Sequence, residues 1–474
     1  MKQGLARFGI AVAGVMTAAT AIAQTEGSIE ERLRRQEERL EAAEAKARAQ
    51  EAEIARLRAA LDAKAAIDAR PIDAKPAPAE PSVLETALRS IKLSGYVQAD
   101  AVLHRQSSQD EVSPAGEPLN QDRFTIPRAR FRIEAARWIL SAALEIDAST
   151  ANGPSVRPVE ASLSIRWQGP DREGVPLLEG TTGLMKIPFG FEVPQLDPQR
   201  HFLERSTAAR ALFPGTYDLG FRLQGGYRFL RYAIAFMNGE PTGEPSLPAR
   251  DPNRGKDLVG RVGVDATPVS WLRVRAGVSA LSGTGFHRGT PATKDVIVWR
   301  DANEDGLVQI SEIQVIGGAP ATPSQNYHRF AIGGDLGITA RLPVIGELTV
   351  LGEIVRAGNL DRAVEPADPV GAGRDFRELG FHVGVTQELT QYAIIGARYD
   401  RYDADADASE QRGITRVPRD SAYSTLAVTG AVRYPPGRLI FEYDRNTNAL
   451  GRTAGGLPTT LADDAFTLRA EVMF

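Results

Sequence analysis

The last eleven residues, DAFTLRAEVMF at positions 464–474, decide the fold. Apolar and polar residues alternate along them, so an extended chain has two different faces. One face holds Phe466, Leu468, Ala470, Val472 and Phe474, and the other holds Thr467, Arg469 and Glu471. A strand that is apolar on one face and polar on the other, and that ends on an aromatic residue, is typical of a barrel in the outer membrane. We therefore expect Phe474 to face lipid and the barrel-assembly machinery to read this ending.

The same alternation recurs upstream. Residues 124–135, FTIPRARFRIEA, place three arginines on one face and Ala129, Phe131 and Ile133 on the other. Alternation alone would also fit a soluble sandwich, whose charged face looks to bulk water. The connections favour a barrel, because most short ones follow even-numbered strands and long ones follow odd-numbered strands. We predict an antiparallel barrel of about 16 strands, at 91–104, 122–136, 138–149, 158–168, 177–187, 217–227, 229–238, 257–267, 269–281, 326–341, 346–358, 375–388, 391–402, 421–434, 438–447 and 464–474.

Composition and the first residues restrict the compartment. The 474 residues are 42% hydrophobic and 24% charged with a net charge of −4, which argues against disorder and against nucleic-acid binding. Residues 1–23 combine Lys2 and Arg7 with an apolar run and a small-residue ending, as in a secretory signal peptide. No later stretch has the roughly 18 apolar residues of a membrane helix. Cysteine is absent, so no disulfide is available.

Residues 28–67 predict a coiled-coil helix. Leu33, Leu40, Ala47, Ile54 and Leu61 fall seven apart, and a second apolar-rich series interleaves with them. A lone solvated helix is the alternative, but so narrow an apolar seam needs a partner. Residues 68–90 are a Pro-rich linker, and the barrel follows at 91–474. The expected location is the outer membrane of a Gram-negative cell, with the coiled coil in the periplasm.

Residues 183–227, GLMKIPFGFEVPQLDPQRHFLERSTAARALFPGTYDLGFRLQGGY, resemble the phosphate-selective porin family of the O and P type. The resemblance lies in a Lys ahead of Pro-Phe-Gly, a long segment with Glu-Arg-Ser, and a return into a strand with an inward Arg. It implies a sixteen-stranded porin, a homotrimer, and a 190–217 loop that folds into the lumen and narrows it. Outer-membrane lipid and lipopolysaccharide would surround the barrel, and the periplasmic helix would reach toward peptidoglycan.

A channel of sixteen strands is wide enough for water, so inward side chains meet the solute. Inward basic candidates are Arg128, Arg130, Arg132, Arg166, Lys186, Arg222, Arg261, Arg273, Arg275, Arg398, Arg433 and Arg469. Guanidinium groups bind phosphate and carboxylate in bidentate fashion, so we predict an anion-binding, pore-lining set. Its members are Arg128, Arg130, Arg132, Arg166, Lys186, Arg205, Arg210 and Arg222. Inward carboxylates leave a second interpretation open, in which mixed charge creates a transverse field across a general pore.

Residues 301–312, DANEDGLVQISE, match the EF-hand calcium loop at its defining positions. The expected ligands of the Ca²⁺ ion are Asp301, Asn303, Asp305, the Leu307 carbonyl, Gln309 and Glu312. The loop lies within the long 282–326 connection, and apolar flanks at 296–299 and 313–316 predict a β-hairpin rather than a helix pair. An ion here would clip a surface ribbon, with no helices to open as in a sensor. An acidic turn that only imitates the motif is the alternative.

Two other functions fit parts of the sequence. A calcium-dependent outer-membrane hydrolase needs a nucleophile near a histidine, and the five histidines show neither paired metal-ligand spacing nor a Ser-His-Asp arrangement. We therefore predict no catalytic residues and no enzyme activity. A structural tether, joining the outer membrane to the cell wall through the coiled coil, is the stronger alternative to a channel for small anionic solutes.

Overall fold

The structure is a computed structural model that describes residues 90–474, apart from 106–121, 152, 170–173, 242–250, 413, 420–421 and 453–457. Of the earlier residues it describes 52, 53, 55, 56 and 59, which are helical and exposed. The chain divides into two units, Met1–Pro81 and Ser82–Phe474. The predicted signal peptide, the predicted linker apart from Ser90, and all but those five residues of the predicted coiled coil lie outside the described residues.

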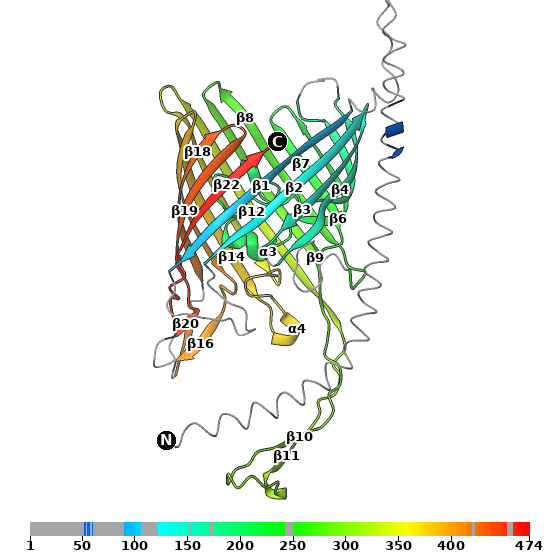
Figure 1. Ribbon diagram of the computed structural model, residues 1–474, viewed down its shortest axis with the longest axis vertical. Helices are drawn as coiled ribbons and strands as arrows, with labels where there is room; N and C mark the ends of the chain where they lie inside the picture. Colours follow the sequence, from blue (N-terminus) through cyan, green and yellow to red (C-terminus); the bar gives the residue numbers. More distant parts are fainter. Residues whose placement is uncertain are drawn as a thin grey trace, which may run out of the picture. The chain divides into compact units, whose positions relative to one another are not determined.

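The second unit is a closed barrel of sixteen strands in which every neighbouring pair is antiparallel (Figure 1). This confirms the predicted fold. The barrel strands are β1 (Ile91–His104), β2 (Arg123–Arg137), β3 (Leu140–Ser149), β4 (Ser155–Trp167), β5 (Leu178–Lys186), β6 (Tyr217–Tyr227), β7 (Leu230–Met237), β8 (Asp257–Val269), β9 (Leu272–His287), β12 (Gln325–Leu342), β13 (Gly346–Gly358), β14 (Arg377–Thr390), β15 (Ala393–Asp403), β18 (Tyr423–Tyr434), β19 (Gly437–Thr447) and β22 (Ala465–Met473).

The C-terminal strand closes the barrel as its alternation predicts. β22 pairs with β1 on one side and with β19 on the other. Arg469 and Glu471 are buried in the lumen, whereas Phe466, Val472 and Phe474 are exposed on the outer face. Phe474 lies beside Gly95, where a Cβ atom would come within 2.6 Å of the phenyl ring. A glycine at this position therefore lets the terminal aromatic side chain lie flat against the first strand.

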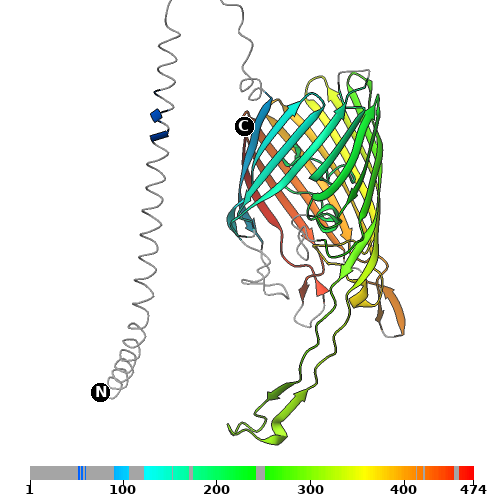
Figure 2. The ribbon, with the colours of Figure 1, turned by 90° about the vertical axis from the view of Figure 1, so that its right-hand side faces the viewer.

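The connections differ in length at the two ends of the barrel. Turns such as 138–139, 228–229 and 435–436 are two residues long, and the opposite end carries most of the long connections. Three of these contain two-stranded hairpins, and the longest hairpin projects well beyond the barrel (Figure 2). The hairpins are β10 (Val296–Trp299) with β11 (Ile313–Ile316), β16 (Ser409–Arg412) with β17 (Thr415–Pro418), and β20 (Gly451–Arg452) with β21 (Pro458–Thr459).

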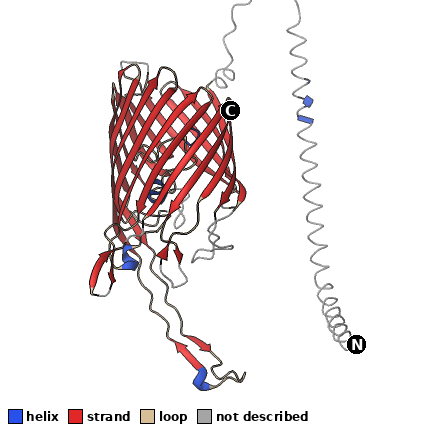
Figure 3. Cartoon of the chain, turned by 90° about the vertical axis from the view of Figure 1, so that its left-hand side faces the viewer, coloured by secondary structure: helices blue, strands red, loops and turns tan. Residues whose placement is uncertain are grey.

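The few helices in the described part of the second unit are short. They are η1 (Asp197–Gln199), α3 (Thr207–Leu212), η2 (Ile310–Glu312) and α4 (Pro369–Ala372). None of the helices described is long and apolar enough to span a membrane. Helix α3 lies inside the barrel, within the connection from β5 to β6 (Figure 3).

An apolar core inside the barrel holds α3 in place. Phe189, Leu212 and Phe213 of the β5–β6 connection pack with inward side chains of the wall, including Val259 and Leu281. The Phe189 and Phe213 rings lie 4.8 Å apart between centroids. Apolar side chains at inward positions would be exposed to water in an open lumen, which is unfavourable. Their positions therefore mark where the connection covers the wall. The lumen is therefore partly filled where this connection packs on the wall.

Candidate functional site

The β5–β6 connection, residues 187–216, crosses the lumen and is hydrogen-bonded to strands around the barrel. The carboxylate of Glu353 on β13 accepts from the backbone N–H groups of Phe191 at 3.0 Å and Glu192 at 3.1 Å. At another point of the wall, Arg469 of β22 donates to the Leu203 carbonyl at 2.8 Å. The expected narrowing of the lumen by this loop is confirmed, and we call residues 187–216 the constriction loop.

Gly190 fixes the course of the constriction loop. Its φ of +62° is one that side chains with a Cβ rarely adopt, and a Cβ atom would lie 2.0 Å from Glu353 Oε1. Its N–H donates to the Ser279 hydroxyl at 3.0 Å. The turn at Gly190 sends Phe189 into the apolar core and leaves Phe191 at the edge of the lumen.

Buried carboxylates of the constriction loop are held in their charged form by basic partners. Burial alone would raise the pKa of Glu192, but His382, Arg398 and the Ser206 hydroxyl outweigh it and lower that pKa to about 2. Glu192 also accepts from the Ser206 N–H at 2.9 Å, at the start of α3. The loop is thus attached to the wall by charged groups as well as by the apolar core.

The three arginines of β2 point into the lumen as predicted, but each is paired with carboxylates. Arg128 donates to both carboxylate oxygens of Glu204, at 2.9 and 2.6 Å. Arg130 lies 3.1 Å from both Glu145 and Asp197. Arg132 binds Glu145 at 3.2 Å and also Glu160. Because Asp197 and Glu204 come from the constriction loop, this triplet secures the loop to the wall.

Three further predicted residues also have local partners. Arg166 binds Glu179 of the neighbouring strand at 3.0 Å. The Lys186 ammonium donates to the Pro194 and Gln195 carbonyls, at 3.3 and 2.7 Å. Arg222 donates to the Lys186 carbonyl at 3.0 Å, with no carboxylate in that contact.

The two predicted arginines of the constriction loop differ from the expectation. Arg205 is buried, and its guanidinium donates to the carbonyls of Ala209, Phe213 and Pro214, which holds the α3 turn together. Arg210 lies on the exposed side of α3 with its guanidinium 3.4 Å from the Thr207 hydroxyl. Sequence alternation cannot place such residues, because a loop has no fixed two-residue period.

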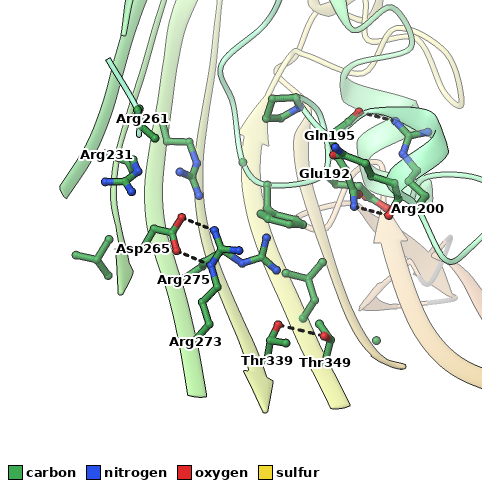
Figure 4. Close-up of a pocket in the computed structure, with 18 of the residues that line it drawn as sticks. Glu192, Gln195, Arg200, Arg231, Arg261, Asp265, Arg273, Arg275, Thr339 and Thr349 are labelled. Atoms are coloured by element: carbon green, nitrogen blue, oxygen red, sulfur yellow. Dashed lines mark hydrogen bonds and ion pairs between the residues drawn. The ribbon is translucent and has the colours of Figure 1, made fainter. Parts of the chain in front are cut away.

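A cavity of about 870 Å³ opens between the constriction loop and the barrel wall. Four arginines of three adjacent strands line it: Arg231 of β7, Arg261 of β8, and Arg273 and Arg275 of β9 (Figure 4). We call these four residues the arginine wall. The eight basic residues predicted for the pore contribute one member to the lining of this cavity as described, Arg222.

The arginine wall has more positive than negative charge. Arg273 makes a bidentate pair with Asp265, at 2.8 and 2.7 Å, and Arg261 lies 2.5 Å from Asp335. Arg275 instead stacks on the Phe191 ring, 4.4 Å from its centroid. Arg231 donates to the Arg228 and Leu230 carbonyls of its own turn. Four guanidinium groups therefore face two carboxylates.

Arg231 is the functional candidate that the sequence analysis missed. Its inward position follows from its pairing with Gly226 of β6 and Gly263 of β8, which share the inward face with Arg222 and Arg261. The alternation of LRYAIAF at 230–236 contains this signal. Tyr232 weakens this alternation, because it places a polar residue at an outward position. In the structure its hydroxyl donates to the Leu177 carbonyl at the rim.

The predicted calcium loop forms the tip of the β10–β11 hairpin, as expected from its flanks. Gly306 has a φ of +73°, and Asp301 accepts from the Gly306 N–H at 2.7 Å. Glu312 accepts from the Ala302 N–H at 3.1 Å and the Trp299 ring N–H at 3.2 Å. The all-oxygen donor set suits Ca²⁺. No three His, Asp or Glu side chains gather as a metal site anywhere in the part of the chain that the structure describes.

No protein-family model and no curated protein matches the sequence. Among solved structures, the chain is similar to an anion-selective porin from Comamonas acidovorans, at 11% identity and a TM-score of 0.48, covering 81% of this chain and 99% of that one. The outer membrane channel DcaP of Acinetobacter baumannii gives 12% identity, a TM-score of 0.46, and 81% and 97% coverage.

A loop L8 deletion mutant of OmpT, an outer membrane protein of Vibrio cholerae, gives 10% identity, a TM-score of 0.47, and 81% and 99% coverage. Likenesses at this level carry no argument about what passes through the barrel. The fold rests on the strand pairing, and membership of the phosphate-selective family stays a prediction.

Proposed function

We propose that this protein is an outer-membrane channel for passive diffusion of small hydrophilic solutes, with a preference for anions. The arginine wall is the observation that carries the preference. Arg231 and Arg275 make no ion pair with a carboxylate among the residues that the structure describes, although Asp265 lies near both, and both line the cavity beside the constriction loop. Rings or ladders of charge at a narrow point select ions by sign, because no wide layer of water screens them.

The charge available in the cavity is that of its unpaired arginines. Eight arginines and five carboxylates line it. Arg200, Arg261 and Arg398 also have partners behind the lining, namely Asp197, Asp335 and Asp400, so Arg231 and Arg275 carry the positive charge that faces a solute. A basic surface in a confined water-filled space raises the local concentration of anions. Inorganic phosphate is the anion that the sequence resemblance suggests, and the arginine wall would bind it through its N–H groups.

Assembly and location are part of the same proposal. The apolar outer face, with side chains such as Phe221, Phe236 and Ile332 exposed, fits contact with membrane lipid. A homotrimer is the assembly that the family resemblance implies. The proposal includes no catalytic group and no enzymatic turnover.

The test is conductance of the full-length protein purified from an outer-membrane fraction. Stepwise current in planar bilayers, from a protein whose gel mobility changes on heating, supports a channel. A heat-modifiable protein that inserts but carries no current would contradict it, and would favour the structural tether.

We also propose, from the sequence motif, that the hairpin tip at 301–312 binds Ca²⁺ weakly. Asp301, Asp305 and Glu312 would supply carboxylate oxygens, and the side chains of Asn303 and Gln309 with the Leu307 carbonyl would complete the set. Binding would stiffen a ribbon that stands free in solution. Calorimetry with millimolar calcium tests this, and the absence of heat at that concentration contradicts it.

A further inference from the structure

The two arginine–aromatic stacks that line the cavity are not equivalent. Arg275 lies over Phe191, at 4.4 Å from guanidinium carbon to ring centroid, and Arg398 lies over Phe202, at 4.8 Å. All four side chains line the cavity. The stacks therefore place a flat apolar surface beside a positive charge at two points of the lumen.

Their charges are balanced differently. Arg398 lies 3.5 Å from both Glu192 and Asp400 and also donates to the Glu204 carbonyl at 2.8 Å. Arg275 has its ring contact with Phe191, and the ion pairs of the described chain give it no carboxylate. The Arg275 guanidinium can therefore bind a carboxylate from solution, whereas Arg398 is already neutralised.

A buried glycine lies between Arg275 and Leu351 on the inward face of the wall. Gly337 of β12 faces the lumen between two side chains, and a Cβ atom there would lie 3.6 Å from Arg275 Nε and 3.4 Å from Leu351 Cδ1. Leu351 lines the cavity as well. Phe191 and Leu351 thus supply apolar surface next to the Arg275 guanidinium.

We infer that the Phe191–Arg275–Leu351 site binds organic anions that join one carboxylate to a flat apolar body, such as aromatic carboxylates. The carboxylate would meet the N–H edge of Arg275, because the Phe191 ring covers one face of that guanidinium. The apolar body would lie against Phe191 and Leu351 and lose contact with water. A small inorganic anion would use only the charge. The inference rests on the proposed channel function and adds the class of solute that is retained.

The test compares two monovalent carboxylates as inhibitors of the chloride current through the full-length protein in planar bilayers. Benzoate has the flat apolar body and acetate lacks it, so the comparison keeps charge constant. We expect benzoate to reduce the chloride current in a concentration-dependent way that acetate does not reproduce. In Phe191→Ala, the benzoate concentration for half-inhibition should rise about two- to fivefold, the range of an exposed ring contact.

Two further variants keep the test decisive. Phe202→Ala removes the ring that stacks on Arg398, whose charge is already neutralised by Glu192 and Asp400. This variant should leave benzoate inhibition unchanged. Phe191→Leu keeps apolar packing in case the alanine variant fails to fold, and should weaken inhibition by benzoate with the chloride-to-potassium permeability ratio preserved. A channel in which benzoate and acetate act alike, or in which Phe191→Ala and Phe202→Ala behave identically, overturns the inference. A protein that carries no current contradicts the channel function itself, which is a separate result.

Discussion

Two sets of inward arginines lie on different parts of the barrel wall, and their surroundings differ. The β2 set, Arg128, Arg130 and Arg132, is paired with carboxylates of the wall and of the constriction loop. The arginine wall of β7–β9 has two carboxylates for four guanidinium groups and borders the cavity. An inward position therefore does not make a charge available to a solute. Availability depends on the neighbours across the sheet and on what covers them.

The largest expected effect comes from removing the two charges of the arginine wall that have no carboxylate partner in the described chain. Arg231→Ala with Arg275→Ala should lower the chloride-to-potassium permeability ratio by about tenfold, because the local excess of positive charge disappears without breaking an ion pair. Reversal potentials in salt gradients measure this ratio. An unchanged ratio would show that selectivity is set elsewhere in the lumen.

The same double change on β2 sharpens the comparison. Arg128→Ala with Arg130→Ala removes the β2 partners of Asp197 and Glu204, which keep Arg200 at 2.6 Å and Arg469 at 3.0 Å. The loss of stability should therefore stay below the about 3–5 kcal/mol of a buried charge left without any partner. We expect the temperature of heat modification on gels to fall clearly, with a smaller change in permeability ratio than in the wall variant. A β2 variant that keeps its stability but loses anion preference would contradict this account. It would show that the β2 arginines select the anion, and that they do not secure the constriction loop.

An intermediate effect is expected from Gly190→Ala. The new methyl group would overlap Glu353 at a backbone angle that alanine rarely adopts, so Phe191 and the segment after it must shift. Single-channel conductance should rise as the lumen widens, and benzoate inhibition should weaken. The control is Gly430→Ala at an outward position of β18, where a Cβ atom would meet nothing described within 4 Å. This control should leave conductance unchanged, and equal conductance in both variants would contradict the role given to Gly190.

The smallest effect on permeation concerns the hairpin tip. Glu312→Gln should abolish any protection of the 288–324 connection from protease by millimolar calcium, because the closing ligand of the loop is lost. Conductance should not change, since the hairpin projects away from the barrel (Figure 2). Protection that persists in Glu312→Gln would show that calcium acts at another place.

The sequence predicted the barrel well because a membrane strand is a local pattern. All sixteen predicted strands exist, and β1, β6 and β13 have the predicted bounds. A short turn such as Pro435–Pro436, or the alternation of β22, is recognised from a few consecutive residues. Its prediction does not depend on contacts between distant parts of the chain.

The candidate site was only partly predictable, for a physical reason. Glu204, which neutralises Arg128, is 76 residues away from it in the chain and reaches it only through the fold of the constriction loop. The pairing of Asp197 with Arg130 depends on the same loop. Inward apolar residues such as Val259 and Leu281 contained the sequence signal for where that loop packs, because an aqueous wall has no reason to carry them.

The sign of the reversal potential of the unmodified channel tests the central claim most directly. With the full-length protein in a planar bilayer and a gradient of potassium chloride, the arginine wall predicts a reversal potential displaced toward the chloride equilibrium potential. A reversal potential at zero, or displaced toward the potassium equilibrium potential, would contradict a lumen whose available charge is positive.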